Sequence, residues 1–400
     1  MQPRMANLLS LAEAQARLLA LAGPLEPEQA PMTEAANRWL TSDIAARIDH
    51  PFADLSAMDG YAIRFAELPG PWRVTQNIAA GAMPSGPLAA GEAARIFTGA
   101  PLPPGADTIL IQEEAARDGD TLRLSGEGPP ARRAHVRLRG SNFQTGDKVL
   151  AAGERLTAPR IGLAATAGHA TLPVRRRARI ALLSTGDELA PPGADLKPGQ
   201  IYESNTPMLA ALLAAEPADL ALHPCVKDDF ETLRAAIASA AANADILVTT
   251  GGASVGDHDL LRPALEAAGA RIDFWKVAMK PGKPLMAGRL GGCVVLGLPG
   301  NPVSAYVTAL LFLKPLIAAL GGAADPLPRT VRLPLAEAVP ANGPRLEFLR
   351  ATLEGGAVRP VRPQDSAALH GLAAADALLV RPPHAPAADA GMFADVLIIA

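Results

Sequence analysis

Asp245-Ile-Leu-Val-Thr-Thr250 is a short apolar run, and Gly251-Gly-Ala-Ser-Val-Gly256 follows it as a loop of small residues. The runs Arg179-Ile-Ala-Leu-Leu183 and Val294-Val-Leu-Gly-Leu298 have the same apolar character. Patterns of helical spacing lie between and after these runs, at 208–215, 230–242, 260–268 and 303–320. Alternation of apolar strands with helices is typical of a parallel sheet covered by helices on both faces, so we expect an α/β domain over 177–324.

The chain on either side of this α/β domain has a different texture. Residues 51–146 alternate short β-prone runs with Gly and Pro turns, which predicts a β-rich domain inserted between two helical pieces, 1–50 and 147–176. The first piece contains a capping box, Ser10-Leu-Ala-Glu13, and the two pieces together are expected to form a helical linker domain. Residues 329–400 predict a C-terminal β-barrel-like domain, so the expected fold class is multidomain α+β. The β-prone runs lie at 95–98, 108–111, 122–124, 330–335, 346–353, 377–380 and 395–399.

The composition of the 400-residue chain excludes several classes of protein. Apolar residues make up 49% and charged residues 19%, so the chain can build cores and is not a disordered tail. A formal charge of −3 gives no electrostatic reason to bind nucleic acid, and 4% aromatic residues are too few for base-stacking surfaces. The apolar run at 305–320 is interrupted by Lys314-Pro315, so we expect no membrane span. Two distant cysteines, and charged residues where a secretory signal needs an apolar core, predict a cytoplasmic protein.

Three loops of small polar residues follow the three strands, at 184–188, 251–256 and 299–304. Loops at the carboxyl ends of parallel strands converge on one crevice, where ligands bind. Their glycines let backbone N–H groups approach an anion, and a following helix adds partial positive charge. The sequence therefore predicts a phosphate or oxyanion pocket, although no loop matches the P-loop or the dinucleotide fingerprint. The candidate binding residues in these loops are Ser184, Thr185, Gly251, Gly252, Ser254, Gly256, Pro299, Gly300, Asn301, Pro302 and Ser304.

Charged residues near these loops could serve the same pocket. Lys276, Lys280 and Lys283 lie in a stretch rich in Pro and Gly, and a stiff loop binds an anion at little entropic cost. The same pattern also suits a solvated basic turn. Acidic residues at 187–188, 228–229 and 257–259 are typical of helix caps, but carboxylates that face phosphate usually imply a bridging Mg²⁺.

The inserted β-rich region contains further candidates. Asp59 precedes a glycine in Ser56-Ala-Met-Asp-Gly-Tyr-Ala62, and Thr98-Gly-Ala-Pro101 is a second turn-like segment. Each is typical of a β-turn when taken by itself. Arg137 and Arg139 are expected on one side of a strand, where they clamp phosphate or face solvent.

Taken in order along the chain, these segments resemble one known family. The segments are 56–62, 98–101, 184–189, 251–259, 280–284 and 297–304. As an ordered set they resemble the molybdopterin molybdenumtransferases of the MoeA type, which are related to the E domain of gephyrin. The resemblance covers nearly the whole chain, and the set is specific although no single motif is.

The resemblance implies a reaction and its partners. Such enzymes insert molybdenum from molybdate into the dithiolene of adenylated molybdopterin, with Mg²⁺-dependent release of AMP, and so form molybdenum cofactor. It also implies a homodimer whose active site lies between the α/β domain of one subunit and the first β domain of the other. Further partners are the adenylyltransferase that supplies the substrate and the molybdoenzymes that receive the product. Nucleic acid and membranes are not expected partners.

The resemblance also implies roles for particular residues. The catalytic carboxylates are Asp59, Glu188, Asp228 and Asp259, and the first three are candidate Mg²⁺ ligands. Asp59 and Thr98 are the contribution of the partner subunit. The molybdate pocket consists of Lys280, Lys283, Ser304, Arg350 and Ser366. Arg137, Lys276 and the small residues of the three loops complete the substrate-binding set.

This sequence departs from the family pattern at one position that matters. Ser141-Asn142 stands where the family typically has an acidic residue after Arg-Gly. An amide side chain accepts hydrogen bonds but adds no negative charge, so we expect weaker or differently tuned activity. Leu55 in place of the commoner Asn is expected to have a mild effect. Tungstate resembles molybdate in size and charge, and the sequence does not choose between them.

Two other functions fit parts of the pattern. A phosphoanhydride or nucleotide hydrolase on a related fold would use the same loops and carboxylates, but would leave Asp59, Thr98 and both β domains unexplained. A non-catalytic scaffold would be an analogy with gephyrin at the level of fold. Such a scaffold would not need the acidic and basic side chains, which are all present.

Overall fold

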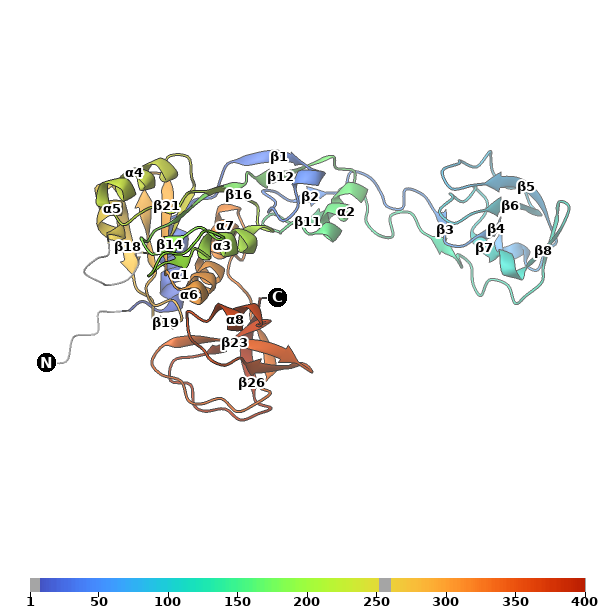
Figure 1. Ribbon diagram of the computed structural model, residues 1–400. Coiled ribbons are helices and arrows are strands. Elements are labelled where there is room, and N and C mark those ends of the chain that lie inside the picture. The colour runs from blue at the N-terminus through green and yellow to red at the C-terminus, as the bar shows by residue number, and fades with distance from the viewer. Residues whose placement is uncertain (1–7, 252–259, 400) are drawn as a thin grey trace. The chain divides into compact units, whose positions relative to one another are not determined.

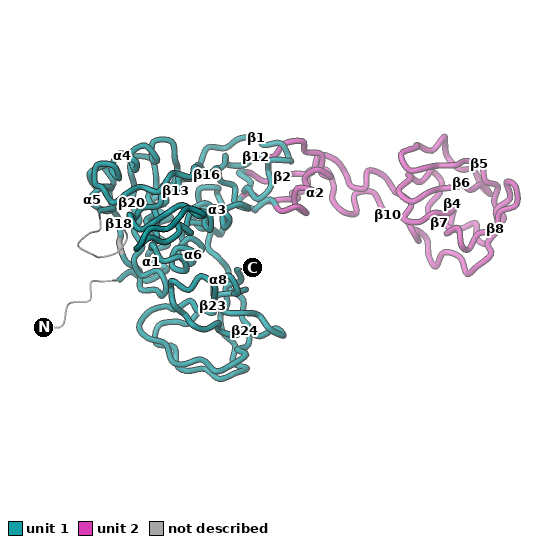
Figure 2. The backbone as a smooth tube through the Cα atoms, viewed as in Figure 1, with its two compact units in different colours: residues 1–41, 153–156, 173–400 teal, residues 42–152, 157–172 magenta. Residues whose placement is uncertain are grey.

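A computed structural model describes residues 8–251 and 260–399. Its contacts divide the chain into two compact units, coloured separately in Figure 2. The larger unit consists of Met1–Thr41, Gly153–Leu156 and Pro173–Ala400, and the smaller unit consists of Ser42–Ala152 and Thr157–Leu172. The inserted β-rich region expected over 51–146 lies within the smaller unit.

The larger unit is built on a six-stranded sheet, with strand order β16-β13-β17-β21-β20-β18. The strands are β16 (Ala218–Leu222), β13 (Ala178–Ser184), β17 (Ile246–Thr250), β21 (Cys293–Leu298), β20 (Met286–Leu290) and β18 (Arg271–Trp275). The expected parallel arrangement holds for the first four strands, whereas β20 is antiparallel to both of its neighbours, β21 and β18. The reason is a tight hairpin at Gly291-Gly292, where the positive φ of Gly291 reverses the chain between β20 and β21.

Helices cover both faces of this sheet, as expected from the alternation of strands and helices. In β13, Ile180 and Leu182 face one core, while Ala181 and Leu183 face the other. The first core contains side chains of α1 (Leu11–Ala20), α3 (Asn205–Leu213) and α6 (Pro302–Thr308). The second contains side chains of α4 (Phe230–Ala241) and α5 (Leu261–Ala267), and Figure 1 shows these two helices on their own side of the sheet.

The first helix begins where its capping box predicts. Ser10 caps α1, because its Oγ accepts the backbone N–H of Glu13 at 3.2 Å while the Glu13 carboxylate accepts the N–H of Ser10 at 3.2 Å. These two bonds satisfy donors that a helix end leaves free. The helix then packs Leu18 into the core of the larger unit.

The apolar stretch 302–320 is one continuous helix, made of α6, a π turn (Ala309–Leu313) and α7 (Lys314–Leu320). The helix expected over 303–320 is thus confirmed, and it continues through Lys314-Pro315. Proline removes the N–H that would bond to the carbonyl of Leu311, and Gln15 of α1 donates its Nε2 to that oxygen instead, at 2.8 Å. By length and composition this helix could cross a membrane, but 83% of its most apolar window is buried inside the fold, as in a core helix.

The C-terminal strands form a second sheet in the larger unit, with order β19-β23-β25-β26-β22. The strands are β19 (Met279–Lys280), β23 (Leu346–Glu354), β25 (Ala377–Arg381), β26 (Phe393–Ile398) and β22 (Val331–Pro334), and β24 (Ala357–Pro360) pairs with β23. A bridge between Leu335 and Val358 connects the end of β22 to β24, which curls the sheet toward a barrel. Because β19 contains Lys280, the lysine loop belongs to this sheet and joins the two parts of the larger unit.

The smaller unit contains another six-stranded sheet, with order β7-β4-β6-β5-β9-β8. Its strands are β7 (Thr108–Ile111), β4 (Gly60–Ile63), β6 (Glu92–Ile96), β5 (Trp72–Ile78), β9 (Thr121–Leu124) and β8 (Ala115–Asp118). Separate two-stranded pairs join β3 (Leu55–Ser56) to β10 (Val136–Arg137) and β2 (Ile44–Ala45) to β11 (Lys148–Leu150). The remaining elements of the chain are β1 (Pro27–Pro31), α2 (Ala158–Thr166), β12 (Thr171–Arg175), β14 (Leu189–Ala190), β15 (Ile201–Tyr202), α8 (Leu369–Ala373) and short 3₁₀ turns at Met32–Glu34, Phe65–Glu67 and Gln112–Glu114.

Candidate functional site

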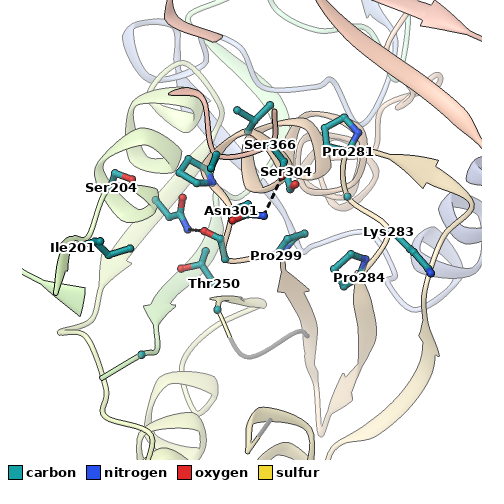
Figure 3. A pocket seen from close by; sticks show the side chains of 18 of the residues that line it. Ile201, Ser204, Thr250, Pro281, Lys283, Pro284, Pro299, Asn301, Ser304 and Ser366 are labelled. Atoms are coloured by element: carbon teal, nitrogen blue, oxygen red, sulfur yellow. Dashed lines mark hydrogen bonds between the residues drawn. The ribbon is translucent and has the colours of Figure 1, made fainter. Parts of the chain in front are cut away.

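A cavity of about 710 Å³ opens in the larger unit, beyond the carboxyl ends of β13, β17 and β21. The described parts of all three predicted loops line it, and β23 with the segment after it closes the other side. Figure 3 places Lys283 and Pro284 at one side, Ile201 and Ser204 at the other, and Asn301, Ser304 and Ser366 between them. The convergence of the three loops at this sheet edge follows from the parallel pairing of their strands.

Carboxylates gather on one side of the cavity, where Glu188 and Asp228 line it. The backbone N–H of Asp228 donates to Asp187 Oδ1 at 3.3 Å, so three acidic side chains lie in this region. Partial burial and the negative charges of Asp187 and Glu188 raise the pKa of Asp228 above its usual value. A Cβ on Gly186 would come within 2.6 Å of Glu188 Oε2, so a larger residue at position 186 would displace this carboxylate.

The donor set on this side is suited to a hard cation that the substrate also binds. Within 8–251 and 260–399, no three His, Cys, Asp or Glu side chains converge into a metal-binding group. Mg²⁺ is commonly held by one or two carboxylates together with substrate phosphates, rather than by a cage of protein ligands. Glu188 and Asp228 fit that pattern, since their mutual repulsion is what a divalent cation relieves.

Buried polar atoms without partners lie in the cavity wall. Thr185 and Thr250 are 3% and 4% exposed, and their hydroxyl groups have no hydrogen-bond partner among the described residues. The same holds for Oδ1 of Asn205, whose Nδ2 donates to the carbonyl of Gly300 at 2.8 Å. Gly251 lies between these groups with φ of +93°, and a Cβ there would collide with the carbonyl oxygen of Thr185. Such orphaned groups indicate a binding site for a polar ligand.

The N-terminal end of the 302–320 helix points into the cavity. Gly300, Asn301 and Ser304 line it, and Ser304 is only 5% exposed. The side-chain amide of Asn301 donates to Ser366 Oγ at 3.0 Å, and the N–H of Val303 donates to the Ser366 carbonyl at 3.2 Å. Because helix N-termini carry partial positive charge, this end of the cavity favours an anion.

The lysine loop supplies full positive charges. Lys280 and Lys283 both line the cavity, and Lys283 is exposed. Lys280 Nζ pairs with Glu347 Oε1 at 2.5 Å, and the two residues face each other across the β19–β23 pairing. Glu347 therefore holds the ammonium group of Lys280 at the edge of the cavity.

Arg350 also lines the cavity, but it is 1% exposed and its guanidinium bonds to protein oxygens. It donates to the carbonyls of Ala368 and Pro363 at 2.5 Å and 2.7 Å, and to Gln364 Oε1 at 3.3 Å. Burial lowers the pKa of this guanidinium from its usual value. Arg350 was expected to bind the anion, but its guanidinium is hydrogen-bonded to residues of the loop 362–368.

The structure separates the other predicted site residues into three groups. Ser184, which is 2% exposed, and Lys276 are in the larger unit but do not line the cavity. Asp59, Thr98 and Arg137 belong to the smaller unit. Four candidates lie outside the described residues, namely Gly252, Ser254, Gly256 and Asp259.

In the smaller unit, Asp59 is held by Thr98. The backbone N–H and the hydroxyl of Thr98 donate to Asp59 Oδ1 at 2.8 Å and 2.7 Å, and these bonds lower the pKa of Asp59. Arg95 lies close enough to add to this effect, with its guanidinium 4.6 Å from the centre of the Phe97 ring. The result is an ionised carboxylate with a fixed orientation at the surface of its unit.

The segment around Arg137 differs from the expected strand with two arginines on one side. The strand β10 ends at Arg137, so Arg139 lies beyond it and pairs with Asp49 at 2.7 Å. Asn142 has its Nδ2 3.3 Å from His50 Nδ1, and its backbone N–H donates to the His50 carbonyl at 3.0 Å. Asn142, which stands in place of the family's acidic residue, thus makes local polar contacts with His50 within the smaller unit.

Several residues that line the cavity were not predicted from the sequence. They come from the stretch between β15 and the start of α3, from β23 and the residue before it, or from the loop after β24: Ile201, Tyr202, Glu203, Ser204, Asn205, Arg345, Glu347, Phe348, Leu349 and Gln364. The Ser204-Asn205 pair is a helix-start signal that precedes the helical pattern expected from 208. The residues of β23 have no local signal, because they reach the cavity only through pairing with β19.

Comparison with protein families matches three models in succession. The MoeA N-terminal region (domain I and II) matches residues 9–168, and a probable molybdopterin-binding domain matches 181–319. The MoeA C-terminal region (domain IV) matches 332–399. The second model contains most of the cavity, and the third contains β23 and the loop that closes it.

Whole-chain relatives give the same result. A molybdopterin molybdenumtransferase of Nostoc sp. is 40% identical, covering 72% of this chain and 69% of the relative. Molybdopterin molybdenumtransferase 2 of Mycobacterium tuberculosis is 37% identical, covering 88% of this chain and 90% of the relative. The crystal structure of the molybdopterin biosynthesis MoeA protein from Pyrococcus horikoshii matches with a TM-score of 0.82 at 26% identity, covering 98% of this chain and 100% of that one.

Proposed function

This chain belongs to the MoeA family of molybdopterin molybdenumtransferases, and on that premise we propose that it inserts molybdenum from molybdate into adenylated molybdopterin, with release of AMP. The observation that carries the proposal is the 710 Å³ cavity, which combines carboxylates, lysines, a helix N-terminus and orphaned buried hydroxyls. The substrate carries a pyrophosphate and molybdate is an oxyanion, so the lysines and the helix N-terminus on one side of the cavity are what the reaction needs.

The positive side of the cavity binds molybdate in this proposal. Lys280 and Lys283 supply the charge, while Ser304 and Ser366 supply hydroxyl donors beside the helix N-terminus. The orphaned hydroxyl groups of Thr185 and Thr250 donate to phosphate oxygens of the nucleotide part. Arg350 lines this side too, but its guanidinium bonds to the loop that carries Ser366.

The acidic side orients the phosphoanhydride that breaks. Glu188 and Asp228 are the residues that would hold Mg²⁺ in the larger unit, and the ion would neutralise phosphate charge there. The carboxylates also accept hydrogen bonds from an attacking nucleophile, which orients it toward the phosphorus. Asp259 is a further member of this group by family resemblance.

A second copy of the chain completes the site. We propose a homodimer in which Asp59 and Thr98 of one copy serve the cavity of the other. The bonds from Thr98 keep Asp59 ionised and oriented, which suits a residue that must act on a separate surface. The proposal retains the four domains expected from sequence, at 1–50 with 147–176, 51–146, 177–324 and 329–400. It also places the protein in the cytoplasm, where the free thiols of Cys225 and Cys293 stay reduced.

The test is AMP release from adenylated molybdopterin by the purified protein with Mg²⁺, compared with and without molybdate. The proposal predicts release that depends on molybdate and yields active cofactor. Release that ignores molybdate would favour the hydrolase, and binding without release would favour the scaffold. Tungstate in place of molybdate shows whether the cavity discriminates between the two oxyanions.

A further inference from the structure

The guanidinium group of Arg350 donates hydrogen bonds to a single loop. Its Nη1 and Nη2 donate to the carbonyls of Ala368 and Pro363, at 2.5 Å and 2.7 Å, and its Nε donates to Gln364 Oε1 at 3.3 Å. All three acceptors belong to the segment 362–368, and the arginine is 1% exposed on β23. A buried cation with three such acceptors cannot turn toward a ligand without abandoning hydrogen bonds that water does not replace.

Gln364 fastens the same loop from its own side. Its Nε2 donates to the carbonyls of Arg350 and Val361, at 2.9 Å and 2.5 Å. Its Oε1 also accepts the backbone N–H of Arg350 at 3.1 Å. The backbone and the side chain of Arg350 on β23 thus both bond to Gln364 in the loop.

The loop carries Ser366 to the far side of the cavity. Ser366 Oγ accepts the side-chain amide of Asn301 at 3.0 Å, and its carbonyl accepts the N–H of Val303 at 3.2 Å. Asn301 is the N-cap of α6, and it makes no side-chain cap bond within the helix. The loop 362–368 therefore connects β23 to the helix N-terminus that faces the ligand.

We propose that Arg350 is a positioning residue that holds loop 362–368, and through it Ser366, against the N-terminal end of α6. Lysine cannot take over this task, because one ammonium group on a flexible stem does not reproduce a planar fork aimed at three acceptors. Ser366 and the helix end meet the oxyanion, whereas Arg350 acts through the loop. The inference rests on the proposed function, since it assigns how that oxyanion pocket is kept in shape.

Amide hydrogen exchange of the full chain, without ligand, tests the positioning step by itself. In Arg350→Lys, exchange at amides 365–369 should rise, because their loop loses its anchor. Arg345→Lys is the matched control: Arg345 lines the same cavity directly before β23, and among the described residues no hydrogen bond joins its side chain to the loop. Unchanged exchange in Arg350→Lys would overturn the proposal, whatever reaction the protein catalyses.

A double-mutant cycle tests the functional step in molybdate-dependent AMP release. Arg350→Lys should raise the KM for molybdate by roughly tenfold and change kcat less, as expected from losing hydrogen bonds to a charged group. Arg350→Lys combined with Ser366→Ala should be no worse than Arg350→Lys alone, because both act through one loop. Additive losses would show that Arg350 contacts the oxyanion directly and would overturn the proposal.

Gln364→Ala extends the test without changing any charge. It should raise the KM for molybdate in the same direction as Arg350→Lys, and it provides a milder variant if Arg350→Lys does not fold. An unchanged KM in Gln364→Ala, together with unchanged loop exchange, would contradict the positioning role. If the wild-type protein releases no AMP in response to molybdate, the proposed function fails while the exchange experiment still decides the fate of the loop.

Discussion

Asp228 in the larger unit and Asp59 in the smaller unit are the same residue type in opposite electrostatic surroundings. Asp228 lies beside Asp187 and Glu188, and partial burial with these charges raises its pKa. Asp59 receives two hydrogen bonds from Thr98, which lower its pKa. One unit therefore carries carboxylates that repel one another, while the other carries a carboxylate whose charge is stabilised by hydrogen bonds.

Each arrangement suits a different task. A crowded carboxylate group binds a cation strongly, because the cation relieves the repulsion within it. A single carboxylate fixed by two donors keeps its charge and direction as the solution changes, so it can act on a ligand bound elsewhere. The four predictions that follow test this contrast, from the largest expected effect to the smallest.

The largest effect is expected when either acidic group is removed. Asp59→Ala and Glu188→Ala should each lower molybdate-dependent AMP release by about 100-fold or more, the size usual for loss of an electrostatic group at a reaction centre. Circular dichroism should show that both variants stay folded. Asp118→Ala is the control in the smaller unit, since Asp118 is exposed on β8 and should be silent. Unchanged turnover in both Asp59→Ala and Glu188→Ala would remove the roles assigned to them.

A smaller effect is expected on the basic side. Lys283→Met should raise the KM for molybdate by roughly tenfold while kcat changes less, because it removes one charge that attracts the oxyanion. Lys197→Met serves as the control, since Lys197 is exposed and does not line the cavity. Equal effects of the two substitutions would point to general attraction by the protein surface instead of a molybdate site.

The hydroxyl of Thr98 should matter mainly at low pH. Thr98→Val removes one of the two donors to Asp59, so the pKa of Asp59 should move back up toward its usual value. The ionised fraction is then lost at a higher pH, and the acid limb of the pH–rate profile should shift upward. Thr98→Ser keeps the hydroxyl and should leave the profile in place. If Thr98→Val has the same pH–rate profile as the wild-type protein, Thr98 does not control the pKa of Asp59.

The smallest effect concerns the stability of the crowded carboxylates. Because the folded-state pKa of Asp228 is raised, the folded protein keeps this proton to a higher pH than the unfolded chain does. The free energy of unfolding therefore falls as pH rises from the unfolded pKa toward the folded one, and the loss persists at neutral pH. Asp228→Asn should raise the free energy of unfolding at neutral pH by an amount of the order of 0.5 kcal/mol, the size usual for a surface substitution, and Tm should rise with it.

Thermal unfolding at two pH values checks the sign of that effect. At about pH 3, below both pKa values, the gain from Asp228→Asn should disappear. Mg²⁺ should raise the Tm of the wild-type protein more than that of Asp228→Asn. Asp195→Asn, an exposed change outside the cavity, should show neither trend. A stability gain that is the same at both pH values would mean that repulsion within the group is not its cause.

The local signals of the sequence predict much of the larger unit. The strands expected at 179–183, 245–250 and 294–298 are confirmed, and so is the capping box at Ser10. The described parts of the three loops converge as expected, because parallel strands bring their carboxyl ends to one edge. These features depend on residues close together in the chain, so periodicity and turn residues identify them.

The features that the sequence did not predict depend on contacts between distant residues. Glu347 meets Lys280 only because β19 pairs with β23. The helix over 303–320 was expected, but the donor that satisfies the Leu311 carbonyl beside Pro315 is Gln15, which is 296 residues away and has no local signal. Arg350 was expected at the oxyanion, yet its three acceptors in the 362–368 loop cannot be found without the fold.

The most direct measurement of the central claim is AMP release from adenylated molybdopterin by the full chain with Mg²⁺, in the presence and absence of micromolar molybdate. We expect release that requires molybdate and is coupled to the appearance of active cofactor, with loss of both in Glu188→Ala. Release at the same rate without molybdate would contradict it, and the cavity would then belong to a phosphoanhydride hydrolase.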